Sequence, residues 1–132
     1  MANALAVLMV ETALPIMMTC ANAGGIEKGQ CLKLTDPFTV AATAGANDIF
    51  GGIAAEEKIT NDGKTKIAVY RAGIFNVESG TTGTTVGKSV KIEANNEFTD
   101  VTADNSDLGY VWGKALETST NGELFLMELG TG

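Results

Sequence analysis

The sequence predicts an all-β protein built as a small β-barrel. Three observations support this prediction: the composition, two turn signals, and a degenerate internal duplication. Apolar residues make up 45% of the 132 residues, charged residues make up 19%, and 16 glycines divide the apolar runs into short pieces. Short apolar runs separated by turn residues are typical of strands rather than helices. A chain of this length can bury the core of one domain without disulfides or a metal.

Residues 1–23 are expected to form an apolar arm or the first strands. The stretch from 1 to 26 contains one charged residue, Glu11. Strand alternation along 5–10 places apolar side chains on both faces, so such a strand must be covered twice, by the core and by a second layer or subunit. The choice between core strand and intersubunit arm stays open. A secretory signal is not indicated, because no Lys or Arg precedes Lys28.

Residues 24–132 are expected to form a single β domain with two pseudo-repeats, at about 24–76 and 82–130. The segment Gly25 to Leu34 matches Gly83 to Ile92 in two glycines, a lysine and a closing aliphatic residue. Two copies of one strand unit predict a pseudo-two-fold barrel in which each half covers the apolar face of the other.

Each repeat continues with a Gly-x-Ala-x-Glu strand, at 52–56 and at 113–117. A turn signal follows, Asp62-Gly63 in one half and Asn121-Gly122 in the other. Because Asn, Asp and Gly tolerate positive φ, these pairs predict type I′ hairpin turns. The glycine- and threonine-rich stretch 77–86 is expected to be an exposed loop that joins the repeats.

The composition argues against several functions. Histidine is absent, which removes the most frequent general base and metal ligand. The net charge of −7 disfavours nucleic acid, and no basic cluster predicts a membrane surface. The glycines of 83–89 lack the spacing of a phosphate loop, so no nucleotide cofactor is predicted. We therefore expect no enzyme activity and no cofactor.

No metal site is predicted either. Asp100, Asp104 and Asp107 lack the ligand spacing of a calcium loop, so solvated loop carboxylates are favoured. Cys20 and Cys31 are too far apart for a zinc half-site. Buried reduced thiols are favoured over a disulfide, which stays open as an alternative.

Most aromatic residues are expected in the core, because they lie in or beside predicted strands. Two of them are also candidates for exposed anchors on a partner protein. One is Phe38, which follows Pro37 in a turn-like segment, and the other is Trp112, the sole tryptophan.

The sequence resembles the small decoration (cement) proteins of tailed-phage heads, similar to lambda-type head decoration proteins. The resemblance is carried by the strand starts at 25–34 and 83–92 and by the segments 51–57, 67–75 and 113–126. The resemblance covers most of residues 24–129. It implies a β-clip or β-tulip-like fold, a homotrimer, and a place on the outer surface of the virion capsid after synthesis in the host cytoplasm.

The resemblance also implies a function: a structural virion protein that stabilises the shell by bridging subunits of the major capsid protein. The alternative is a small ligand- or carbohydrate-binding β domain with an aromatic platform around Trp112. A third possibility, an enzyme, would require a polar pocket in which several of Glu56, Glu57, Lys58 and Asp62 converge. The residues expected to contact the capsid or another subunit are Leu5, Val7, Met9, Leu14, Pro15, Ile16, Phe38 and Trp112.

Overall fold

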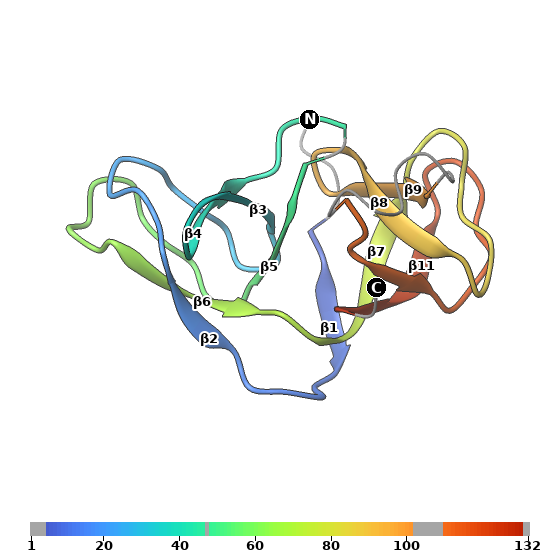
Figure 1. Cartoon of the computed structure of the whole chain (residues 1–132), viewed down its shortest axis with the longest axis horizontal. Helices are drawn as coiled ribbons and strands as arrows, with labels where there is room; N and C mark the ends of the chain where they lie inside the picture. The colour runs from blue at the N-terminus through green and yellow to red at the C-terminus, as the bar shows by residue number, and fades with distance from the viewer. Residues whose placement is uncertain (1–4, 47, 102–109, 131–132) are drawn as a thin grey trace.

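The computed structural model describes residues 5–46, 48–101 and 110–130 (Figure 1). Within these residues the chain forms eleven strands and no helix, so the all-β prediction is confirmed. No helix in the described part could span a membrane. The strands are β1 (Val7–Val10), β2 (Ile16–Thr19), β3 (Cys31–Asp36), β4 (Thr39–Ala42), β5 (Phe50–Ala54), β6 (Lys66–Tyr70), β7 (Gly73–Ser79), β8 (Ser89–Ala94), β9 (Glu97–Asp100), β10 (Gly113–Ala115) and β11 (Leu124–Leu129).

The strands close into two barrels that lie side by side (Figure 1). In the first barrel the order is β2-β4-β3-β5-β6, and β2 closes it by pairing antiparallel with β6 and parallel with β4. In the second barrel β7 takes the place of β2, because it pairs antiparallel with β11 and parallel with β9. The remaining pairings, β8 with β9 and β10 and β10 with β11, repeat those of the first barrel.

The two barrels agree with the internal duplication in their details. An isolated bridge joins Ile26 to Lys58 in the first barrel, and Thr84 to Ser119 in the second. The turn between the second and third strands of each barrel contains a residue with positive φ that is not glycine, which is Phe38 at 54° or Asn96 at 62°.

The arrangement differs from the single two-fold barrel that the sequence predicted. Each half contributes five strands and pairs both edges of β2 or β7 within itself, so it closes without strands from the other half. The barrels span residues 16–70 and 73–129, shifted from the predicted repeats. The stretch 77–86 is not the junction, because its first three residues belong to β7.

Side chains of both barrels meet in one core cluster. The inward residues of β7 alternate along the strand, and they include Phe75 and Val77. Cys31 and Ile53 from the first barrel lie in the same cluster. The first barrel also has its own cluster, which contains Cys20. Both thiols are buried and unpaired, and burial raises the pKa of each.

A buried polar contact also joins the barrels. The side-chain oxygen of Asn96 accepts a hydrogen bond from the backbone N–H of Cys31 at 2.8 Å, and its amide nitrogen donates to Gln30 Oε1 at 3.2 Å. Gln30 Nε2 donates to Asn95 Oδ1 at 2.7 Å. The β8–β9 turn is thereby docked on the first barrel.

The two predicted hairpin turns have a different geometry. A type I′ turn requires positive φ at both central residues. Gly63 and Gly122 have φ of 85° and 78°, but Asp62 and Asn121 are not in this region. The type I′ assignment is therefore wrong, and both turns lie in longer loops before β6 and β11.

Candidate protein-binding surface

The segment from β1 to β2, which leads from the edge of the second barrel into the first, carries a row of exposed apolar side chains. β1 lies at the edge of its sheet and pairs with β7 alone among the described strands, and β2 follows after a short loop (Figure 1). Leu14 has 78% of its surface exposed, and the other members of the row are between 41% and 56% exposed. We call this row the apolar stripe, and its members are Val7, Met9, Val10, Leu14, Ile16 and Met17.

The described residues cover one face of this segment only, whereas the sequence alternation required cover on both. Ala6 is buried and Leu8 is partly buried against the core cluster. The one charged group is Glu11, whose Oε2 accepts a hydrogen bond from Tyr70 Oη at 3.1 Å. The pKa of Tyr70 is raised, mainly by burial and to a smaller extent by this hydrogen bond to Glu11. The stripe is therefore an apolar surface on a strongly acidic protein, with Glu11 as the one carboxylate in its segment.

Most of the residues predicted to contact a partner are accessible. Val7, Met9, Leu14 and Ile16 belong to the stripe, and Leu5 and Pro15 beside them are half-buried. The sequence analysis missed Val10 and Met17. Strand alternation placed Val10 on the face of Leu8, but β1 has a register shift between Leu8 and Val10. Met17 was not among the residues that the alternation considered.

Phe38, which the sequence left open between core residue and exposed anchor, has 56% of its surface accessible. It lies beside the end of β2, because the backbone N–H of Thr19 donates to the Phe38 carbonyl at 2.8 Å. Phe38 therefore stands near the β2 end of the apolar stripe.

The prediction that Trp112 contacts a partner is wrong for this surface, because its side chain is fully buried. Its ring packs edge-on against Phe50 and Phe98, and its Nε1 donates to the carbonyl of Asp48 at 3.0 Å. A large aromatic side chain whose polar atom finds a partner is best placed in a core. A sugar could not stack on Trp112 in this structure, because the indole ring has no exposed face.

The acidic and basic groups of an enzyme-like cluster have separate roles. Lys58 is buried, and its Nζ donates to the carbonyls of Asn22 and Ile59 and to Asp62 Oδ1, at 2.7, 3.1 and 3.2 Å. Glu56 instead accepts from the backbone N–H of Ala68 at 2.8 Å. Lys58 therefore fixes the loop between β5 and β6.

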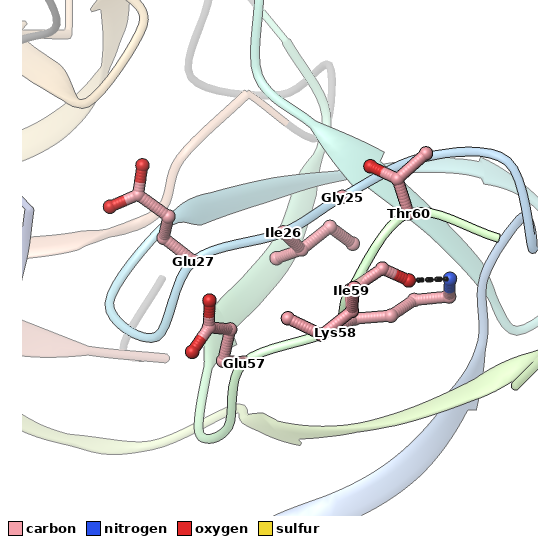
Figure 2. A pocket seen from close by; sticks show the side chains of 7 residues that line it. All are labelled: Gly25, Ile26, Glu27, Glu57, Lys58, Ile59 and Thr60. Carbon is pink, nitrogen blue, oxygen red and sulfur yellow. Dashed lines mark hydrogen bonds between the residues drawn. The ribbon is translucent and has the colours of Figure 1, made fainter. Parts of the chain in front are cut away.

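A shallow pocket opens beside this lysine. Figure 2 shows the carboxylates of Glu27 and Glu57 on the side of the pocket away from Lys58 Nζ, which points to the Ile59 carbonyl. The Lys58 ammonium group uses all three of its N–H donors on oxygen partners. Its role in this pocket is therefore to stabilise the loop between β5 and β6.

The acidic loop residues show no metal arrangement in the part that is described. Asp104 and Asp107 lie outside the described residues. Asp100 accepts a hydrogen bond from the backbone N–H of Thr85 at 3.0 Å. Among the described residues, no group of three or more acidic or thiol side chains could hold a metal ion.

Comparison with known proteins gives a structural likeness. No family model and no curated protein matches the sequence. The fold is similar to the crystal structure of the head fiber gp8.5 N base of bacteriophage phi29, with a TM-score of 0.53. The match covers 92% of this chain and 94% of the other, with 15% identity. At this identity the likeness describes the fold.

Proposed function

We propose that this protein is a structural virion protein that binds the outside of a phage capsid and stabilises the shell by bridging major capsid protein subunits. The observation that carries the proposal is the apolar stripe. A row of half-exposed apolar side chains on a chain of net charge −7 is typical of a protein-binding surface. The fold of a phage head-fiber base supports the phage head as the place where the surface acts.

The proposed role is mechanical. Burial of a half-exposed aliphatic side chain contributes about 1 kcal/mol to association. Six such side chains, repeated over many copies on a shell, favour the decorated state by mass action because the protein binds the intact lattice. The shell then breaks only after these contacts are lost.

Co-sedimentation with undecorated, expanded phage shells tests the proposal. We expect saturable binding, and shells that resist heating to a higher temperature when they are coated. The variant Met9→Ser/Leu14→Ser/Met17→Ser removes three side chains of the stripe that are at least half exposed. It should bind roughly 100-fold more weakly, since each 1.4 kcal/mol changes affinity tenfold.

The matched control is Val86→Ser/Leu124→Ser. These residues are exposed to 57% and 54%, but they belong to the second barrel and lie outside the stripe. This variant should bind as the natural sequence does. Equal loss in both variants, or a natural protein that never pellets with shells, would contradict the proposal.

A further inference from the structure

The turn that carries Phe38 has a backbone conformation that phenylalanine disfavours. Its φ of 54° lies in the left-handed region, where a bulky residue is strained. Pro37 precedes it and accepts a hydrogen bond from Thr39 Oγ1 at 3.1 Å. The Phe38 carbonyl is bound by Thr19 N–H, as described above. The chain therefore strains this residue while leaving its ring in solvent.

The equivalent turn of the second barrel shows what such a turn does. Asn96 occupies the same position with φ of 62°, and asparagine tolerates this region well. Asn96 is 1% exposed, because the turn docks on the first barrel through Cys31 and Gln30. In the first barrel the same turn is exposed and docks on no other barrel among the described residues. Phenylalanine occupies a position where asparagine would carry less backbone strain.

A groove suited to an aromatic ring lies beside β1. Its volume is about 500 Å³, which is within the range of pockets that hold small ligands. Four of its six lining residues are apolar, and the only formal charge is that of Lys28. The lining residues are Leu5, Ala6, Val7, Leu8, Lys28 and Tyr70.

We propose that the Phe38 ring of one copy inserts into this groove on a second copy, with Asp36 of the first copy facing Lys28 of the second. Phe38 lies near the Thr19 end of β2, whereas Tyr70 follows Val69, the partner of Ile16 at the other end. Donor and acceptor sites are thus separate on each copy, and the contact is head-to-tail. Head-to-tail contacts form rings when the rotation closes.

Charge complementarity supports a second copy as the occupant. Copies of net charge −7 repel one another, so a contact between them needs a favourable charge pair. Asp36 is exposed two positions from Phe38, and Lys28 is exposed at the groove. No ion pair joins either of them to another residue in the described ranges. The proposed contact pairs the Asp36 carboxylate of one copy with the Lys28 ammonium group of the next.

Light scattering on the full-length protein measures this contact without any shell. The natural protein should form a closed oligomer with a single defined mass. Asp36→Lys, Lys28→Asp and Phe38→Asn should each reduce the mass to that of a monomer. The double variant Asp36→Lys/Lys28→Asp should restore the oligomer, because it reverses the pair while keeping the net charge.

The controls are Glu57→Lys and Lys64→Asp, two exposed residues of the first barrel that change the net charge by the same amounts. They should leave the mass unchanged. Circular dichroism should show every variant folded. Phe38→Asn should melt at no lower temperature than the monomeric Lys28→Asp variant, since Asn fits positive φ and neither variant is stabilised by association. A monomeric natural protein, an oligomeric Phe38→Asn variant, or a double variant that stays monomeric would overturn the proposal.

Shell binding separates this inference from the proposed function. A variant that is monomeric but still pellets with shells through the stripe would uphold both proposals. Oligomers that obey the charge reversal but never bind shells would uphold the Phe38 contact and remove capsid binding.

Discussion

Two carboxylates meet where the second barrel closes. Glu78 and Glu97 stand directly opposite each other in the parallel pairing of β7 with β9. Burial raises the pKa of Glu97, and the charge and hydrogen bond of Glu78 raise it further. At neutral pH the two charges weaken the β7–β9 pairing that closes the barrel, because like charges opposite each other across strands are destabilising.

The substitution Glu97→Gln should therefore stabilise the fold by about 0.5 kcal/mol at pH 7. A raised carboxyl pKa means that the folded state binds the proton more tightly. The natural protein thus loses stability as the pH rises from the ordinary Glu value of about 4 through the folded pKa. The test is urea unfolding of the natural protein and of Glu97→Gln at two pH values, about 7 and about 3.5. The gain should vanish at the lower pH, and the exposed control Glu57→Gln should show no comparable gain.

At the scale of elements, the β8–β9 turn decides how firmly the barrels are joined. Asn96→Gly keeps the backbone free to adopt positive φ but removes both side-chain hydrogen bonds and leaves the Cys31 N–H without its partner. We expect a loss of about 2 kcal/mol in the free energy of unfolding. Asn96→Ala adds strain of about 1 kcal/mol more. Urea unfolding in which the Gly variant matches the natural protein would show that the contact contributes nothing.

The same elements show how far the sequence could go. The match of Gly25–Leu34 with Gly83–Ile92 found the duplication, because the turns before β3 and β8 need the same residues. It could not find where each repeat begins. β2 and β7 share little sequence, and their parallel pairing with β4 and β9 is a contact between segments that local patterns do not encode.

The apolar segment could be noticed in the sequence for a related reason. The shortage of charge in residues 5–17 is a local property, and residues that it singled out, such as Met9 and Leu14, are exposed in the structure. Contact with a partner stays a prediction. For Trp112 the sequence left core and exposed anchor open, because two of its core partners, the Phe50 ring and the Asp48 carbonyl, come from the other barrel. The groove at Lys28 was not predicted at all, since its walls come from three separate segments.

The whole molecule should unfold as one unit, although it contains two closed barrels. Cys31 and Ile53 of the first barrel lie in the core cluster of the second, and Phe50 and Tyr70 pack against it. A barrel released from its neighbour would expose this apolar surface and leave the Asn96 contact unmade. Separation of the barrels without unfolding is therefore costly.

The two thiols provide a direct measurement of this cooperativity. Cys31 lies at the contact between the barrels, and Cys20 lies in the separate cluster of the first barrel. Each can be followed alone, with Cys20→Ala to leave Cys31 and Cys31→Ala to leave Cys20. Labelling by a thiol reagent over a range of urea concentrations should give both the same free energy of opening, equal to that of global unfolding in the same variant. Cys31 labelling with a smaller free energy than Cys20 would instead mean that the barrels part while each stays folded, and the protein would then reach its partners as two hinged bodies.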